Sequence, residues 1–442
     1  MKTVKKNTKE ELKMKAKLNP NILNARRTGD YINPDGTLRR NTGRQGRHNN
    51  NTAVVGAAGS GKTNGIAMEE ILAGGGGGSM VILDTKNALH DECAPVLEKM
   101  TYKIIKLDFA DPARSMHCNN LDAVKTTNDA QKASSGIVFT GVDKNSLREP
   151  FWKDSEKLLL NACLGYLMEE GRGFEKNFEG LGKLLLTFDA EAISEGMDCD
   201  ATRIFERHRE LYKQRTGRDS WAYEQFSKFM GLSKRTLSCV LMEALNSLQA
   251  FDTYEMREMT RVSDFDIKSI ADEKTVVFVN VSDTDRSKDA AINILFTQIM
   301  DTLCRYADSL PEKYLPVPVR FILDDFGSSA KIEGFENMIS NIRSRGISVM
   351  ILLQSISQLK QGYGEGYNTI LANCGTQFYM GGSDPATAEY FSLLTNKPVE
   401  RILNMPYMTH WQINKYGSPK FGKTILLDSY ALEERELDDR EP

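Results

Sequence analysis

Hydrophobic residues along the 442-residue chain follow two alternating patterns. Short runs rich in β-branched residues alternate with segments whose apolar positions recur every three to four residues, as expected for strands and amphipathic helices. Nearly continuous apolar runs are typical of parallel strands buried on both faces. The strands are predicted at residues 52–55, 80–83, 104–107, 275–281, 319–323, 349–353 and 376–380. This order predicts an α/β fold with a mostly parallel sheet covered by helices.

Helical periodicity dominates the interval of more than 160 residues between the third and fourth predicted strands. We therefore expect an inserted all-α domain at 146–254. Its last helix is predicted at 223–248, because the apolar positions from Phe226 to Leu248 form one stripe. The glycine run 74–78, which directly precedes a predicted strand, is interpreted as an engineered linker or a mobile surface turn, in either case without a chemical role.

The composition, with 40% hydrophobic and 26% charged residues, is that of a soluble globular protein and argues against disorder or a collagen-like chain. No apolar run approaches the roughly 18 residues needed to span a bilayer, and the first residues lack the apolar core of a signal peptide. We therefore expect a cytoplasmic chain. The seven cysteines contain no C-x-x-C pair, so buried thiols are expected rather than a zinc site or a disulfide framework.

The net charge of −3 conceals a strong asymmetry. Residues 1–48 contain 13 Lys and Arg against 4 Asp and Glu, and their hydrophobicity is low. This composition predicts a basic flexible arm that could contact nucleic acid, an acidic partner or a membrane surface. A merely solvated tail is the alternative. Residues 429–442 are predicted to form an acidic, exposed C-terminal tail.

The segment GAAGSGKT at 56–63 matches the complete phosphate-loop pattern G-x-x-x-x-G-K-[ST] between a predicted strand and a helix. Its glycines allow backbone N–H groups to surround an anion, and the helix N-terminus adds its dipole. We expect Lys62 to reach the β- and γ-phosphates of ATP and Thr63 to offer its hydroxyl to Mg²⁺. The predicted nucleotide-binding residues are Gly56, Gly59, Ser60, Gly61, Lys62 and Thr63.

Two acidic residues, Asp324 and Asp325, directly follow the predicted strand at 319–323. A parallel sheet brings such a strand end beside the phosphate loop. We expect Asp324 to hold hydrated Mg²⁺ and Asp325 to polarise the attacking water, although a solvated pair of acids is the alternative. Gln354 follows the next predicted strand, at a position similar to that where RecA-like ATPases carry a polar sensor for the γ-phosphate.

A helix predicted between these two strands has apolar residues at i, i+3, i+4 and i+7, from Phe335 to Ile342, which define an inward face. Arg343 and Arg345 follow at its end. They are either ordinary cations stabilised by a helix C-terminus or, in a ring of subunits, arginines that enter a neighbour's active site.

The chain resembles the type IV secretion coupling proteins of the TraG kind, conjugative-transfer ATPases related to FtsK and HerA motors. The resemblance covers most of residues 45–400. It rests on GAAGSGKT, VILDTKN and EPFWKDSEKLLLNACLGYL, and most specifically on FILDDFGSSAKIEGFENMISNIRSRGISVMILLQS and ILANCGTQFYMGGSDPATAEYFS.

This resemblance implies a hexameric ring of RecA-like domains with an all-α domain, which receives a relaxase bound to single-stranded DNA and delivers it to the secretion channel. Lys62 and Thr63 match the Walker A pair, and Asp324 and Asp325 match the Walker B pair. Gln354 matches the sensor and Arg343 the arginine finger that acts in trans.

The sequence departs from the family pattern at three places. Asp325 stands where relatives usually carry Glu, and Asp84-Thr85-Lys86-Asn87 stands where many carry D-P-K-G. The membrane-anchoring helices common at the family's N-terminus are not found in this sequence, which fits a naturally soluble member, a shortened chain or a redesigned one. The resemblance implies a soluble form that acts at the cytoplasmic face of the membrane. The expected RecA-like domain comprises residues 49–145 and 255–428.

The sequence thus favours an ATP-hydrolysing motor of conjugative DNA transfer, with ATP and Mg²⁺ as cofactors. Its expected partners are DNA (single-stranded, and as an alternative double-stranded), the relaxase and its complex, the secretion channel and further copies of the chain. Two other functions stay open. One is a double-stranded DNA pump of the FtsK or HerA type, and the other is a nucleotide-gated docking adaptor with little turnover.

Overall fold

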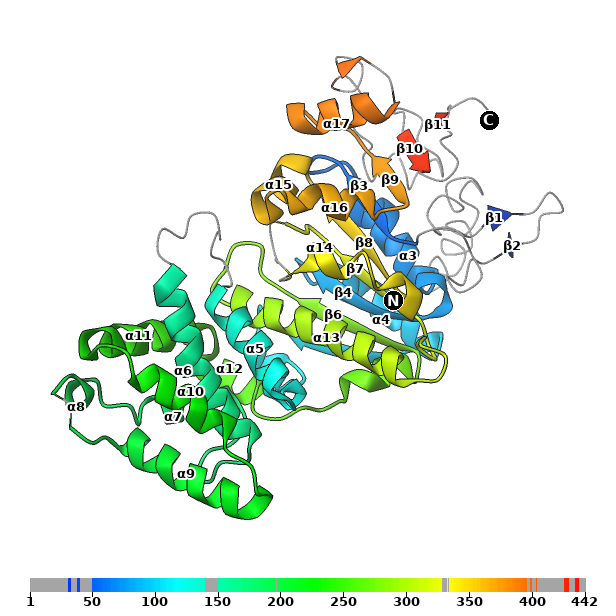
Figure 1. Ribbon diagram of the computed structural model, residues 1–442. Coiled ribbons are helices and arrows are strands. Elements are labelled where there is room, and N and C mark those ends of the chain that lie inside the picture. The colour runs from blue at the N-terminus through cyan, green and yellow to red at the C-terminus, as the bar shows by residue number, and fades with distance from the viewer. Residues whose placement is uncertain are drawn as a thin grey trace, which may run out of the picture.

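A mostly parallel sheet forms the centre of the molecule (Figure 1). The computed structural model describes residues 50–139, 150–195, 197–327, 332, 334–395, 398–399 and 403, together with strands at 31–32, 38–39, 425–428 and 434–436. Across the main sheet the strand order is β11-β10-β9-β3-β8-β7-β4-β6-β5.

The seven strands from β9 to β5 are parallel to one another. All seven were predicted, with boundaries correct to within two residues, because these strands are buried and read as apolar runs. Their bounds are Thr52–Val55 (β3), Ser79–Asp84 (β4), Lys103–Asp108 (β5), Thr275–Asn280 (β6), Val319–Leu323 (β7), Ile347–Leu353 (β8) and Thr376–Tyr379 (β9). The predicted α/β class is confirmed.

Four short strands were not predicted. β10 (Ile425–Asp428) pairs antiparallel with β9, and β11 (Glu434–Glu436) pairs antiparallel with β10. β11 therefore places part of the predicted acidic tail at the edge of the sheet. Within the basic arm, β1 (Tyr31–Ile32) and β2 (Leu38–Arg39) form a separate antiparallel pair. The rest of the arm lies outside the described residues.

Helices cover both faces of the sheet. Successive side chains of each strand point to opposite faces, and because both sets are apolar, both faces need to be covered. Val54 and Ile82 pack on the face covered by α3 and α4, whereas Val55 and Leu83 pack on the opposite face. The helices of the nucleotide-binding part are α3 (Met68–Leu72), α4 (Ala88–Lys99), α13 (Asp289–Ser309), α14 (Phe335–Met338), α15 (Ile356–Tyr363), α16 (Gly366–Ala372) and α17 (Pro385–Thr395).

The interval between β5 and β6 is helical in its described residues, as predicted, and most of its helices gather at one side of the sheet (Figure 1). Its helices are α5 (Thr127–Phe139), α6 (Pro150–Met168), α7 (Phe178–Leu185), α8 (Ala190–Glu195), α9 (Asp200–Thr216), α10 (Trp221–Met230), α11 (Lys234–Ser247) and α12 (Tyr254–Met259). The boundaries of an all-α domain at 146–254 stay a prediction.

The prediction of one helix at 223–248 was wrong. The chain leaves the helix after Met230, and Ser233 starts a new one by accepting a hydrogen bond from the Thr236 N–H. The predicted apolar stripe is nevertheless inward, since Phe229 and Val240 are fully buried on either side of the break. Side-chain capping at Ser233 therefore outweighs the continuous apolar periodicity.

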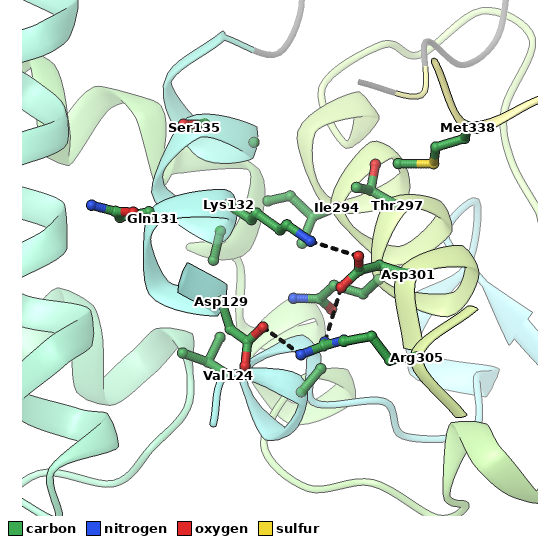
Figure 2. Close-up of a pocket in the computed structure, with 14 residues that line it drawn as sticks. Val124, Asp129, Gln131, Lys132, Ser135, Ile294, Thr297, Asp301, Arg305 and Met338 are labelled. Atoms are coloured by element: carbon green, nitrogen blue, oxygen red, sulfur yellow. Dashed lines mark hydrogen bonds and ion pairs between the residues drawn. The ribbon is translucent and has the colours of Figure 1, made fainter. Parts of the chain in front are cut away.

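Ion pairs connect α5 to α13, which lies against the sheet. Figure 2 shows Lys132 pointing to Asp301, and Arg305 lying between Asp301 and Asp129. The Lys132–Asp301 and Arg305–Asp129 contacts are both 2.6 Å, and Arg305 lies 2.9 Å from Asp301. These residues flank a cavity of about 330 Å³. Because α5 also packs against α6, the ion pairs tie the helical region to the sheet layer.

The glycine run before β4 forms a turn. Gly74, Gly75, Gly76 and Gly77 all have positive φ, the left-handed region that favours glycine. A Cβ on Gly78 would lie 2.1 Å from the Pro318 carbonyl oxygen. The local backbone therefore requires glycine, and the run forms a turn.

The predictions about membrane-spanning segments and about buried cysteines can both be compared with the structure. Among the described residues, none of the helices has the length and apolar character needed to cross a membrane. Five of the seven cysteines are buried as expected, whereas Cys304 is half-buried and the prediction was wrong for the exposed Cys239.

Candidate nucleotide site

The predicted phosphate loop at 56–63 follows β3, with parallel strands on both sides. Gly56 donates its N–H to the Leu353 carbonyl at 3.0 Å, which continues the pairing with β8. Ala57 donates to the Gly381 carbonyl at 2.9 Å, beyond the end of β9. The loop is therefore held from both neighbouring strands.

The turn of the loop depends on two glycines. Gly59 and Gly61 have φ of 77° and 88°, so both need the left-handed region that glycine adopts without strain. Ser60 between them is buried. A wide, π-type helical turn over Lys62–Ala67 follows and continues as α3, so the loop leads into a helix as the motif requires.

Lys62 folds back over the loop. Its Nζ donates to the carbonyl oxygens of Gly56 at 2.6 Å and Ala57 at 3.1 Å, and the residue is 6% exposed. Burial lowers the pKa of Lys62, while the charges of Asp325 and Asp324 oppose this shift. The ammonium group thus lies within the loop that would surround a phosphate.

The hydroxyl of Thr63 donates to Asp324 across 261 residues of sequence. Both Asp324 carboxylate oxygens lie 3.0 Å from Thr63 Oγ1, and the Asp325 N–H donates to one of them at 3.1 Å. Burial raises the pKa of Asp324 to about 7, and the Asp325 carboxylate adds to the rise. The two residues predicted to bind Mg²⁺ are therefore in contact.

Asp325 and Gln354 are also brought together at the ends of β7 and β8. The Gln354 amide donates from Nε2 to Asp325 Oδ1 at 3.1 Å. Asp325 has φ of 48°, an uncommon conformation for a residue other than glycine. The predicted water-polarising acid and the predicted sensor thus form a hydrogen-bonded pair beside Asp324.

Arg343 lies near the amino-terminal end of β8, whereas the site residues lie at the carboxyl ends of the strands. It begins a 3₁₀ turn that precedes β8, whereas Gln354 follows the other end of this seven-residue strand. At about 3.3 Å per residue, the strand separates the two by roughly 20 Å. Arg345 is held within the chain, where its guanidinium donates two 2.9 Å hydrogen bonds to Asp308. Neither arginine is brought to this chain's own phosphate loop.

Sequence reasoning gave no site role to Asp84 or Gly381. β4 pairs with β7 up to Leu83 and Leu323, so Asp84 follows at the strand end beside Asp324. Asp84 is 1% exposed, accepts the His90 N–H at 2.9 Å, and has a pKa raised by burial. The strand-ending Asp of VILDTKN was the available signal. Gly381 contributes only a backbone carbonyl, which leaves little trace in a single sequence.

The sequence of the chain matches the model of one protein family over most of its length. Residues 2–397 match the family described as "Type IV secretory system Conjugative DNA transfer". The chain belongs to this family. It is 25% identical over 351 residues to protein VirD4 of Rhizobium rhizogenes, covering 77% of this chain and 48% of that protein. It is 24% identical over 369 residues to the conjugal transfer protein TraG of Escherichia coli, covering 79% and 56%. The chain thus spans about half the length of these relatives.

Solved coupling-protein structures share the fold. The trigonal form of the bacterial conjugative coupling protein TrwBdeltaN70, in complex with sulphate, has a TM-score of 0.62 at 19% identity, covering 88% of this chain and 86% of that chain. The plasmid coupling protein TrwB with the ATP analogue ADPNP has a TM-score of 0.59 at 20% identity, covering 89% and 87%. The likeness confirms the predicted α/β RecA-like fold.

Proposed function

We propose that this chain is an ATP-hydrolysing coupling protein of conjugative DNA transfer and type IV secretion. It binds DNA and recruits the relaxase bound to it for delivery to the secretion channel, at the cytoplasmic face of the membrane. The observation that carries the ATPase assignment is the contact between Thr63 and Asp324, because it joins the phosphate loop to the acidic end of β7. The role in DNA transfer rests on the family match.

The hydroxyl oxygen of Thr63 and the carboxylate oxygens of Asp324 suit Mg²⁺, which prefers oxygen ligands of this kind together with phosphate oxygens. Thr63 and Asp324 would hold the ion, which would neutralise charge on the β- and γ-phosphates. The plasmid coupling protein TrwB has been solved with ADP and Mg²⁺, which supports the same cofactors here. Lys62 would bind the phosphates once its hydrogen bonds to Gly56 and Ala57 are exchanged.

Asp325 would orient and polarise the attacking water, and Gln354 would hold Asp325 in place while sensing the γ-phosphate. Charge that develops on the transferring phosphoryl group needs a further cation. Arg343 would supply it to the neighbouring subunit of a homo-hexameric ring, because it lies too far from its own loop. The RecA-like part would comprise 49–145 and 255–428, and the all-α part 146–254.

A second candidate function is a nucleotide-gated docking adaptor with little turnover. The Asp325–Gln354 hydrogen bond favours it, because the carboxylate is short and already engaged by an amide. Nucleotide affinity with a hydrolysis rate near background would support this alternative.

The experiment that tests the proposed function measures ATP hydrolysis without DNA, with single-stranded DNA and with duplex DNA, while particle mass is recorded on the same samples. We expect stimulation by single-stranded DNA together with a shift to the mass of a ring. Stimulation by duplex alone would favour a double-stranded DNA pump. Hydrolysis that never responds to DNA would contradict the motor function.

A further inference from the structure

A second cavity, of about 610 Å³, lies in the helical region between the end of α6 and one face of α9. Ile204, Leu211 and Tyr212 of α9 line it together with Tyr166 of α6. The first two are aliphatic and half-buried, so the lining has apolar surface on which a side chain could pack. None of the residues assigned to the nucleotide site lines this cavity.

The charged residues that line the cavity are mostly arginines. Arg172, Arg207 and Arg215 contribute to the lining, against one acid, Glu170. Arg215 already has partners within the chain, since it donates to Glu170 Oε2 at 3.0 Å and to the Glu169 carbonyl at 2.7 Å. Among the described residues, Arg172 and Arg207 are exposed and form no ion pair. Two guanidinium groups are therefore available to an anionic partner.

The wall between these arginines is held by buried hydrogen bonds. His208 Nε2 lies 2.8 Å from Glu169 Oε2, and both residues are buried. Glu169 also accepts from Ser220 Oγ at 2.7 Å and from the Trp221 N–H at 2.9 Å, at the start of α10. The Tyr166 hydroxyl donates to the Arg172 carbonyl at 2.8 Å. α6, α9 and α10 thus present a cavity that needs little reorganisation to bind.

The aromatic rings of the cavity contact side chains of their own chain, and the Tyr166 ring is buried. Tyr166 packs against Phe205 and His208 with ring centroids 5.3 and 4.6 Å apart. The Arg215 guanidinium lies 5.7 Å from the centre of the Tyr212 ring. Proteins that hold single-stranded nucleic acid stack bases on open aromatic faces. Rings that contact their own chain favour a peptide over a nucleic acid.

We propose that this α6–α9 cavity docks an acidic peptide segment of a protein partner. Arg172 and Arg207 pair with carboxylates of the peptide, and an apolar side chain of the peptide packs on Ile204 and Leu211. The inference deepens the proposed recruitment function by naming the chemistry of the recruited segment. Guanidinium–carboxylate hydrogen bonds are among the stronger polar contacts, and removing them has a measurable cost.

The test uses the full chain and a fluorescent peptide of alternating glutamate and leucine, with a glutamine-for-glutamate peptide as the matched probe. We expect the acidic peptide to bind and the glutamine peptide to bind at least about tenfold more weakly. The double substitution Arg172→Gln with Arg207→Gln should weaken binding of the acidic peptide by about tenfold or more, and Arg207→Gln alone by less. Arg203→Gln is the control, because Arg203 lies on the same helix but outside the cavity lining.

Equal affinity for the two peptides, no binding, or an equal effect of Arg203→Gln would overturn the proposal. Direct binding of single-stranded DNA that the double substitution abolishes, without binding of the acidic peptide to the parent protein, would also overturn it and assign the cavity to nucleic acid. ATP hydrolysis of the parent protein is measured separately. If the parent hydrolyses ATP but does not bind the peptide, only the docking proposal is wrong. If it binds the peptide but does not hydrolyse ATP, only the ATPase assignment is wrong.

Discussion

The hydroxyl oxygen of Thr63 lies 3.0 Å from both carboxylate oxygens of Asp324. Thr63 lies in the first turn of the helix after the phosphate loop, and Asp324 directly follows β7, a strand two positions from β3 in the sheet. Neither segment could bind a metal–nucleotide complex alone. Their contact produces a site with a lysine, a hydroxyl and a carboxylate around one point.

Asp325→Glu is predicted to raise ATP turnover. The added methylene extends the carboxylate toward the water, and small errors in the placement of a catalytic group cost about ten- to a hundredfold in rate. Steady-state phosphate release with saturating ATP and DNA measures the effect, and Asp325→Asn, which loses the base, serves as the inactive control. A Glu variant slower than the parent would show that the φ of 48° at Asp325 already compensates for the short side chain.

Arg343→Ala is predicted to reduce hydrolysis by roughly 10³- to 10⁵-fold, the range measured for trans arginines in other NTPases, with little change in ATP affinity. Arg345→Ala is the matched control, because Arg345 pairs with Asp308 of its own chain and should retain hydrolysis.

Mixing separates action in cis from action in trans. Arg343→Ala subunits carry an intact Lys62, and Lys62→Ala subunits still present Arg343. Mixed rings should regain activity, because some interfaces combine the two intact residues. If mixed rings form and remain inactive at every ratio, Arg343 is an ordinary cation beside a helical turn.

Deletion of residues 1–48 is predicted to reduce the salt dependence of DNA binding. The arm carries 13 Lys and Arg, and the slope of log affinity against log salt falls by about one unit for each DNA phosphate that the truncated protein no longer neutralises. The truncation keeps Asn50, whose carbonyl accepts from Arg320 at 2.9 Å. Titrations between about 50 and 200 mM salt provide the measurement. An unchanged slope would exclude the arm from DNA binding.

Asp129→Asn is predicted to destabilise the fold by roughly 1.5–3 kcal/mol near neutral pH, as expected when hydrogen bonds to a charged group are removed. Burial opposes ionisation of Asp129, but the Lys125 N–H, the Thr126 hydroxyl and Arg305 together lower its pKa. A carboxyl with a lowered folded pKa stabilises the protein above its unfolded pKa of about 4 and loses this contribution as pH falls through the folded value.

Urea unfolding of the parent and the Asp129→Asn variant should therefore show a free-energy difference that is largest near pH 7 and shrinks below about pH 4. Asp154→Asn is the control, because its exposed pair with Lys157 is 3.6 Å long and should change stability little. A difference independent of pH would contradict the ion-pair role of Asp129.

The sequence alone predicted the strands and the converging site residues because both follow from local patterns. Apolar runs identify buried parallel strands, and the carboxyl ends of such strands meet at one edge, which is why Thr63, Asp324 and Gln354 were expected together. The break after Met230 was missed because capping competes with periodicity. The α6–α9 cavity could not be predicted, since it depends on how Tyr166 and His208 pack across helices.

ATP hydrolysis by the parent protein and by Lys62→Ala, compared in the presence of single-stranded DNA, tests the proposed nucleotide site without depending on any other residue. Lys62 is the one side-chain cation that the phosphate-loop motif itself supplies to the β- and γ-phosphates. We predict DNA-stimulated phosphate release by the parent and release at background by Lys62→Ala. Hydrolysis by Lys62→Ala at the parent rate would contradict the assignment of residues 56–63 as the nucleotide site.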